Sequence, residues 1–146
     1  MDGVQMSSAP VRSSDGRARG ETEKLTINLG VVDLGQVDLL VQEGFYSNRT
    51  DLIRTAIRNQ LAVHADEIKR TLARRTLVLG LQHLSRKDLE RARAAGELLH
   101  IQVVGLAQIA QDVSPELARA TIQSVRVLGA FHASAAVRKA LADRIL

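Results

Sequence analysis

The pattern of apolar and polar positions changes twice along the chain. Residues 1–22 are rich in Ser, Gly and Arg and show no apolar period, so we expect a disordered tail. The stretch KLTINL, residues 24–29, then alternates strictly between polar and apolar, which predicts a short strand. Apolar positions at helical spacing follow over residues 34–61, and short apolar runs alternate with helical segments over residues 76–146. The pattern predicts an α+β protein.

The first predicted helix follows the strand and spans about ten residues. Asp33 and Gln36 have the spacing of a capping box, which predicts that Asp33 caps the helix. Gly44 stands where a helix commonly ends in the left-handed conformation. The apolar stripe consists of Leu34, Val37, Leu40 and Val41.

The second predicted helix begins after Asn48, which Asp51 follows at the spacing of a capped helix start. Its apolar stripe consists of Ile53, Ala56, Ile57 and Leu61. Because no Gly or Pro occurs between Gly44 and Gly80, we expect the helix to run on past His64 as a connector over residues 65–75.

The C-terminal half repeats itself. Residues 101–118 and 125–142 align at a shift of 24, and residues 76–84 match at a shift of 25, with a glycine in register each time: Gly80, Gly105 and Gly129. This period predicts three strand–glycine–helix units in a small β/α stack or solenoid over residues 76–146. The alternatives are a βαβ effector domain, like that of nickel-responsive regulators, and chance similarity of short apolar strands.

Composition excludes several kinds of site. The chain has no cysteine, so disulfides, thiolate metal sites and cysteine nucleophiles are ruled out. His64, His83, His100 and His132 have no partner at a helical i,i+4 spacing, and we expect ordinary surface histidines and no metal or cofactor. No phosphate-binding loop, G-x-S-x-G elbow or HExxH motif occurs. We therefore expect a protein that is not an enzyme.

Charge and hydropathy suggest where the protein works. The formal charge of +4 is compatible with a polyanionic partner but is weak, so local geometry must supply any nucleic-acid binding. No apolar run approaches the roughly 20 residues that span a bilayer, and the first residues lack the features of a secretory signal. We expect a cytoplasmic, nucleoid-associated protein without a membrane partner.

The stretch LGQVDLLVQEGFYSNRTDLIRTAIRNQL, residues 34–61, resembles the ribbon-helix-helix family of the Arc, MetJ and CopG type. The matching positions are Glu43, Gly44, Tyr46, Asn48, Arg49, Thr50 and Asp51. The resemblance covers residues 23–62 or so. It departs from the family at Gly30, where a Pro is common, and in a strand-to-helix connection that is one residue longer.

The resemblance implies a homodimer that binds double-stranded DNA. A single strand is not stable alone, and pairing with the strand of a second chain would complete a ribbon that fits the major groove. Lys24, Thr26 and Asn28 would face the bases, while the apolar positions cover the helices. The start of the second helix would bind phosphate through a group consisting of Ser47, Asn48, Arg49 and Thr50. In the tail, Arg12, Arg17 and Arg19 could form an arm toward DNA, although a solvated tail is the commoner case.

The sequence thus predicts four segments: a tail (1–22), a ribbon-helix-helix domain (23–64), a helical connector (65–75) and a repeat domain (76–146). The expected function is that of a sequence-specific transcriptional repressor. We expect the repeat domain to support higher oligomers or to bind a protein partner. Two alternatives remain, namely an antitoxin of a toxin–antitoxin pair and a polymerising scaffold protein.

Overall fold

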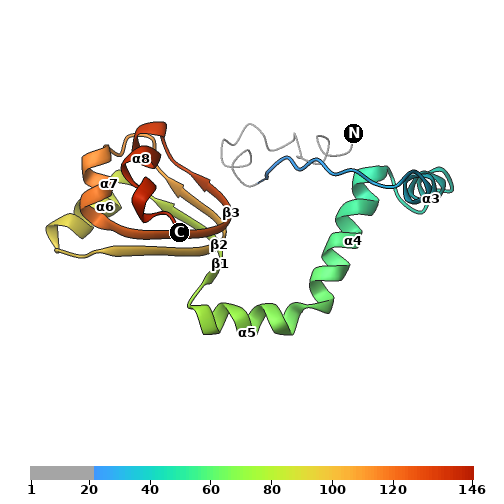
Figure 1. The fold of residues 1–146 in the computed structure, drawn as a ribbon, viewed down its shortest axis with the longest axis horizontal. Helices are drawn as coiled ribbons and strands as arrows, with labels where there is room; N and C mark the ends of the chain where they lie inside the picture. Colours follow the sequence, from blue (N-terminus) through green and yellow to red (C-terminus); the bar gives the residue numbers. More distant parts are fainter. Residues whose placement is uncertain (1–21) are drawn as a thin grey trace. The chain divides into compact units, whose positions relative to one another are not determined.

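The structure is a computed structural model that describes residues 22–146. This part of the chain is α+β, as predicted, and divides between Lys69 and Arg70 into two compact units (Figure 1). The proposed arginine arm of Arg12, Arg17 and Arg19 lies outside the described residues, as does almost all of the predicted tail.

The N-terminal unit consists of an extended lead-in followed by helices α3 (Val31–Gln42) and α4 (Arg49–Val63). Residues 22–30 form neither helix nor strand, so the KLTINL stretch is not a strand in this single chain. The physical reason is that a strand requires a hydrogen-bonded neighbour. No other strand occurs among the described residues of this unit.

Helix α3 begins earlier than its sequence signal predicts. Its N-cap is Gly30, whose carbonyl oxygen accepts the N–H of Leu34 at 2.9 Å, and no side chain caps it. The prediction that Asp33 is the cap was therefore wrong. Asp33 instead lies in the first turn, where its carboxylate favours the positive end of the helix dipole. At the other end, Gly44 has the predicted left-handed conformation, with φ = 86°.

Helix α4 begins where the sequence predicts, because the side chain of Asn48 accepts the backbone N–H of Asp51 at 2.9 Å. The expectation that it runs on past His64 was wrong. His64 interrupts the helix, and a separate helix α5 (Ala65–Arg75) follows. The carbonyl of His64 accepts the N–H of Ile68 at 2.9 Å and so starts α5. Neither Gly nor Pro marks this break.

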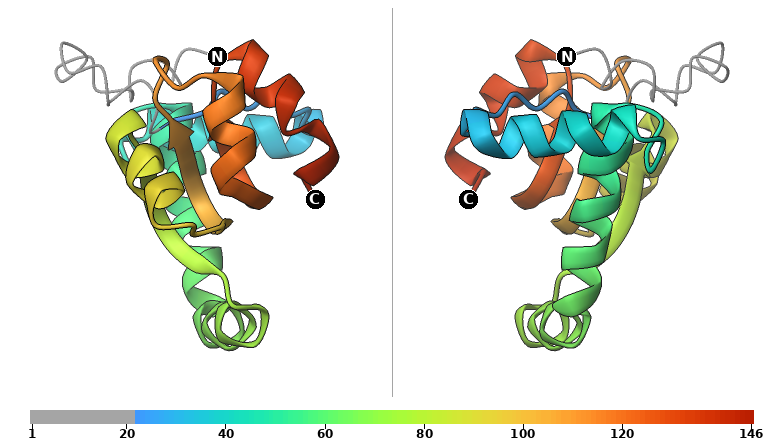
Figure 2. Two further views of the ribbon diagram at one scale, coloured as in Figure 1. Left: turned by 90° about the vertical axis from the view of Figure 1, so that its left-hand side faces the viewer. Right: turned by 90° about the vertical axis from the view of Figure 1, so that its right-hand side faces the viewer.

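The C-terminal unit contains a parallel sheet in the order β1-β2-β3. Its strands are β1 (Val78–Leu84), β2 (Leu99–Ile109) and β3 (Ile122–His132). Each strand is followed by a helix: α6 (Arg86–Ala94), α7 (Pro115–Thr121) and α8 (Ala135–Ala140), after which the 3-10 helix η2 (Ala142–Arg144) ends the fold. The helices pack side by side, α6 against α7 and α7 against α8 (Figure 2). Each strand and its helix therefore make one coil of a stack.

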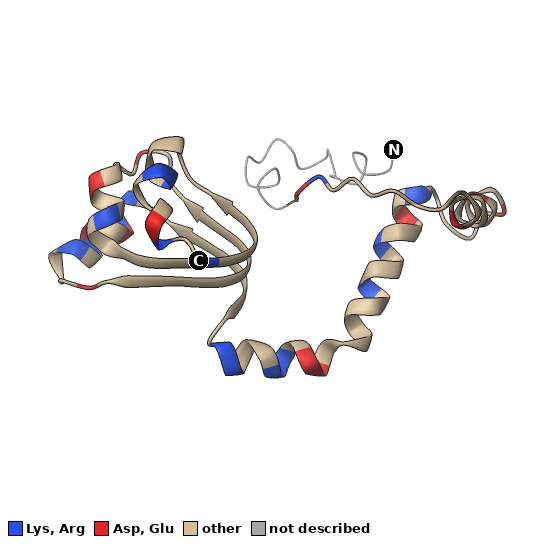
Figure 3. Ribbon diagram, viewed as in Figure 1, with Lys and Arg blue, Asp and Glu red and all other residues tan. Residues whose placement is uncertain are grey.

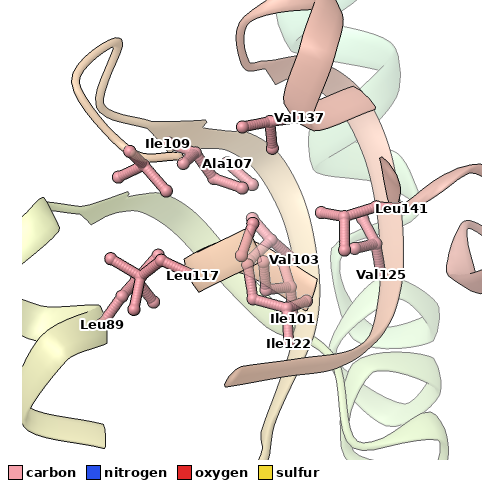
Figure 4. Packing of buried hydrophobic residues seen from close by; sticks show 12 residues of the cluster. Leu89, Ile101, Val103, Ala107, Ile109, Leu117, Ile122, Val125, Val137 and Leu141 are labelled. Carbon is pink, nitrogen blue, oxygen red and sulfur yellow. The ribbon is translucent and has the colours of Figure 1, made fainter. Parts of the chain in front are cut away.

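The same local device starts the helix in every coil. Ser85, Ser114 and Ser134 each occupy the N-cap and accept a backbone N–H from three residues further on. The side chains between strands and helices form one apolar core (Figure 4). Its fully buried members include Leu89, Ile101, Val103, Ile109, Ile122, Val125, Val137 and Leu141.

The three strands share a column of glycines, one in each strand. Gly80 is paired with Gly105, and Gly105 with Gly129, so the shifts of 25 and 24 seen in the sequence are the register of the sheet. All three have positive φ, between 121° and 140°, which side chains rarely adopt. This confirms the predicted three-unit repeat and its stacking.

Candidate nucleic-acid interface

The predicted base-reading residues Lys24, Thr26 and Asn28 are all exposed in the extended lead-in to α3. They alternate with apolar residues that are exposed as well: Leu25 by 70%, Ile27 by 52% and Leu29 by 42%. One chain by itself therefore covers neither face of this segment. A polar and an apolar face remain available to a partner.

The predicted phosphate-binding group is brought together at the start of α4. The Oδ1 atom of Asn48 accepts the N–H of Asp51, and the Oδ2 atom of Asp51 accepts the N–H of Ser47, both at 2.9 Å. This reciprocal pair fixes the turn that leads into the helix. It also engages the backbone N–H of Ser47. As in any helix, the backbone amides of the first turn of α4 have no acceptor within the helix.

Arg49 is held by a residue that sequence reasoning missed. Its Nε and Nη2 atoms donate to Oδ1 and Oδ2 of Asp38 at 2.7 and 2.9 Å. These hydrogen bonds, together with the positive charge of Arg49, hold the pKa of Asp38 below its ordinary value. The bidentate pair joins α3 to the start of α4. Because the two residues are eleven positions apart and lie on different helices, no helical spacing rule could have found the pair.

Thr50 differs from the other members of the group because the residue as a whole is buried, with 6% exposed. Helix α4 is fifteen residues long, so its start has the positive dipole end that favours an anion.

Apolar surface dominates the rest of the N-terminal unit. Helix α3 has no buried residue, and Thr50 is the only buried residue of α4. Besides the lead-in, the exposed large apolar residues are Val31, Val32, Leu39, Leu40, Phe45, Ile57, Leu61 and Val63. Exposed large apolar side chains in this number are typical of a surface that a partner covers. Basic residues lie along α4 and α5 (Figure 3), with Arg58 exposed and Arg54 partly exposed.

Other kinds of site find little support in residues 22–146. The described residues contain no cluster of three or more His, Cys, Asp or Glu that could hold a metal ion. Two histidines have polar neighbours instead, His64 beside Gln60 and His100 beside Ser124, at 3.3 and 2.8 Å. Within the same residues, no helix has both the length and the hydropathy to cross a bilayer.

Comparison with protein families gives a match that covers most of the chain. Residues 20–138 match the model of the Ribbon-Helix-Helix transcriptional regulator family. The chain belongs to this family. Neither the curated proteins nor the solved structures contain a match to it.

This family of transcriptional regulators binds DNA, typically as dimers. The match extends through β3 into α8, far beyond the residues 23–62 that carry the resemblance in the sequence. The β/α repeat is therefore part of what the family model describes, not an unrelated addition to a DNA-binding unit.

Proposed function

We propose that this regulator represses transcription as a homodimer that inserts a two-stranded ribbon into the major groove. The observation that carries the proposal is the uncovered apolar surface of the N-terminal unit, where one chain buries no residue of α3. Two copies of residues 24–29, paired antiparallel, would place Leu25, Ile27 and Leu29 over the helices of both chains. The pairing would supply the missing strand neighbour and the missing cover in one step.

In this arrangement the other face of the ribbon carries Lys24, Thr26 and Asn28 from each chain. A lysine donates to guanine O6 and N7, and an asparagine can pair bidentately with adenine. A threonine contributes its hydroxyl or contacts the thymine methyl group. Each good base contact gives about 1–3 kcal/mol of discrimination.

The starts of the two α4 helices would grip the DNA backbone on either side of the groove. Phosphate would be bound by amides of the first turn, where Asn48, Arg49 and Thr50 follow one another. Arg49 serves this site as a positioning residue, since the Nε and Nη2 donors of its guanidinium are already bound to Asp38. Backbone donors of this kind explain how a chain with a formal charge of only +4 could bind DNA.

The experiment is the selection of DNA bound by the full chain from a random pool at a fixed salt concentration. A short palindromic or repeated site is the expected result, because two-fold symmetry of the protein is mirrored in its site. Lys24→Ala and Asn28→Ala should each lose the preference for this site while keeping the circular dichroism spectrum of the parent protein. Arg58→Ala, which removes an exposed charge from α4, is the matched control and should keep the preference.

A random pool that yields no preferred site would contradict sequence-specific binding. Unchanged specificity in both lead-in variants would contradict the ribbon even if DNA binding persists. Repression itself is tested with a reporter gene behind the selected site, where the parent protein should lower expression and Lys24→Ala should not.

The structure of the C-terminal unit bears on the antitoxin alternative. An antitoxin would require a segment that becomes ordered on its toxin, whereas residues 76–146 fold around their own buried core. This observation favours the regulator. Co-purification of a neighbouring gene product that blocks DNA binding would favour the antitoxin instead.

A further inference from the structure

The two ends of the β/α stack differ. At the β3 end, the C-terminal segment covers the start of the edge: the N–H of Leu146 donates to the carbonyl of Val125 at 2.8 Å, and Ile145 forms a bridge with Val125. Arg144 donates to the carbonyl of Ile122 at 2.7 Å. An ion pair between Arg119 and Asp143, at 2.7 Å, holds this C-terminal segment in place.

At the other end, β1 pairs with β2 alone. Val78 and Leu79 are each 65% exposed and Leu81 is 62% exposed, although Val103 and Leu106, the β2 partners of Val78 and Leu81, are buried. Among the residues of the C-terminal unit, 70–146, no other strand pairs with the outer edge of β1. The terminal repeats of a stack normally carry a polar cap, and β1 has none.

The sequence of β1, VLGLQHL, also lacks the usual protection of a free edge. Exposed edge strands are normally blunted by charged residues, proline or a bulge. β1 has no Lys, Arg, Asp, Glu or Pro, and its register with β2 is unbroken from Val78 to Leu84. Because the strand has no fixed charge, two copies of it can approach each other without repulsion.

The occupant best matched to this edge is a second copy of the same chain. Only two residues separate the end of α5 at Arg75 from the start of β1 at Val78. The open end is thus the end of the stack that is tethered to the N-terminal unit. A dimer formed by the N-terminal units brings two such ends to a high effective concentration, which makes even a weak edge contact form.

We propose that β1 pairs antiparallel with β1 of a second copy and joins the two stacks into one continuous sheet. A two-fold axis between identical edge strands requires the antiparallel direction. We take the register that brings the two positive-φ glycines together, in which Gly80 lies opposite Gly80. Leu79 then lies opposite Leu81 of the second copy, as an apolar cross-strand pair. The inference rests on the proposed function to the extent that the N-terminal dimer supplies the tether.

The test is a disulfide cross-link in the full chain, which has no native cysteine to interfere. Leu79→Cys and Leu81→Cys chains, co-expressed with two different affinity tags, should form a mixed disulfide dimer under mild oxidation. The matched control pairs Leu79→Cys with Leu128→Cys. Leu128 is comparably exposed, at 59%, and lies in the same row of the sheet but on β3. This control pair should give far less cross-linked product, by a factor of about ten or more, because β3 lies at the opposite end of the stack from the proposed contact.

A second measurement needs no cysteine. Hydrogen exchange of the parent protein should show slow exchange across residues 78–84, and Leu79→Lys should speed it up without changing exchange in β2. Fast exchange in the parent protein would overturn the proposal. So would slow exchange that is lost on deletion of residues 1–21, because the edge would then be covered by the chain's own N-terminal segment.

The outcomes separate this inference from the proposed function. A protein that light scattering shows to be dimeric but that gives no cross-link between positions 79 and 81 overturns the pairing of β1 and leaves the DNA-binding dimer standing. A cross-link between positions 79 and 128 would instead indicate head-to-tail stacking and also overturn the two-fold pairing. When Lys24→Ala is added to both cysteine-bearing chains, cross-linking should be as efficient as without it, because base reading is not involved.

Discussion

A Cβ atom on Gly105 would stand 2.1 Å from the carbonyl oxygen of Gly80, its partner in the neighbouring strand. Gly129 has the same relationship to Gly105, again at 2.1 Å. In both cases the obstacle is backbone, which cannot move aside as a side chain can. The column therefore requires glycine for two reasons, namely the positive φ of each residue and the close approach of the neighbouring strand.

The first prediction concerns this contact. Gly105→Ala should destabilise the C-terminal unit by more than about 3 kcal/mol, because strain at positive φ adds to a backbone clash. Gly35→Ala is the control: Gly35 lies inside α3 with nothing within 4 Å of an added Cβ, and alanine should stabilise that helix by about 0.5–1 kcal/mol. Urea unfolding followed by circular dichroism measures both. An unchanged midpoint for Gly105→Ala would contradict the close approach.

The glycine column also shows what the sequence could reveal. Its shifts of 25 and 24 residues were visible because each coil repeats the same contacts, and a repeated contact leaves a repeated residue. The stacking of three coils and the alignment of their glycines followed from that alone. The Asp38–Arg49 pair left no such trace, since it occurs once and joins two helices through a turn whose geometry the sequence does not specify.

The second prediction compares two residues that looked alike in the sequence. Asn48→Ala should destabilise the N-terminal unit by about 1 kcal/mol, because its side chain caps α4. Asp33→Ala should lose only a few tenths of a kcal/mol, because Asp33 contributes to the helix dipole but caps nothing. Thermal unfolding of the two variants measures both losses of stability. Equal losses would show that Asp33 does cap its helix.

This pair explains why helix starts are hard to place from sequence. Asn48 and Asp33 each have a side-chain oxygen acceptor, and each is followed three residues later by a residue that suits a capped helix start. The pattern alone does not show which of the two caps its helix. Gly30 begins α3 without any side-chain cap, so the stronger local signal at Asp33 was misleading. The break at His64 likewise had no signal, because neither Gly nor Pro marks it and backbone hydrogen bonds close α4 and open α5 there.

The third prediction is a pH dependence of the C-terminal unit. Hydrogen bonds from the backbone and side chain of Ser85, and then from Arg91, lower the pKa of Asp88 from 3.8 to about 2. Since the folded pKa lies below the unfolded value, the stabilisation is present above about pH 4 and is lost as the pH falls toward about 2. The melting temperature of the parent protein should therefore fall more steeply over this range than that of Asp88→Asn. Parallel curves for the two proteins would refute the assignment.

The fourth prediction tests the role given to Arg49. Because Asp38 neutralises it, Arg49→Gln should leave the slope of log K against log salt for DNA binding almost unchanged. Asp38→Asn should release the guanidinium toward phosphate and steepen the slope by about 0.9. If Arg49→Gln by itself lowers the slope by about that amount, Arg49 contacts phosphate directly, as the sequence first suggested. Titrations at several salt concentrations decide the matter.

The glycine column has a consequence for how this half of the molecule can vary among relatives. Residues added within a strand would shift every later glycine away from its neighbour and bring a side chain against a carbonyl. The C-terminal unit can instead be lengthened in its loops, or by the addition of whole coils that each carry their own glycine. The spacing of the glycines is therefore fixed, and duplication of a complete unit is the natural way for the stack to grow.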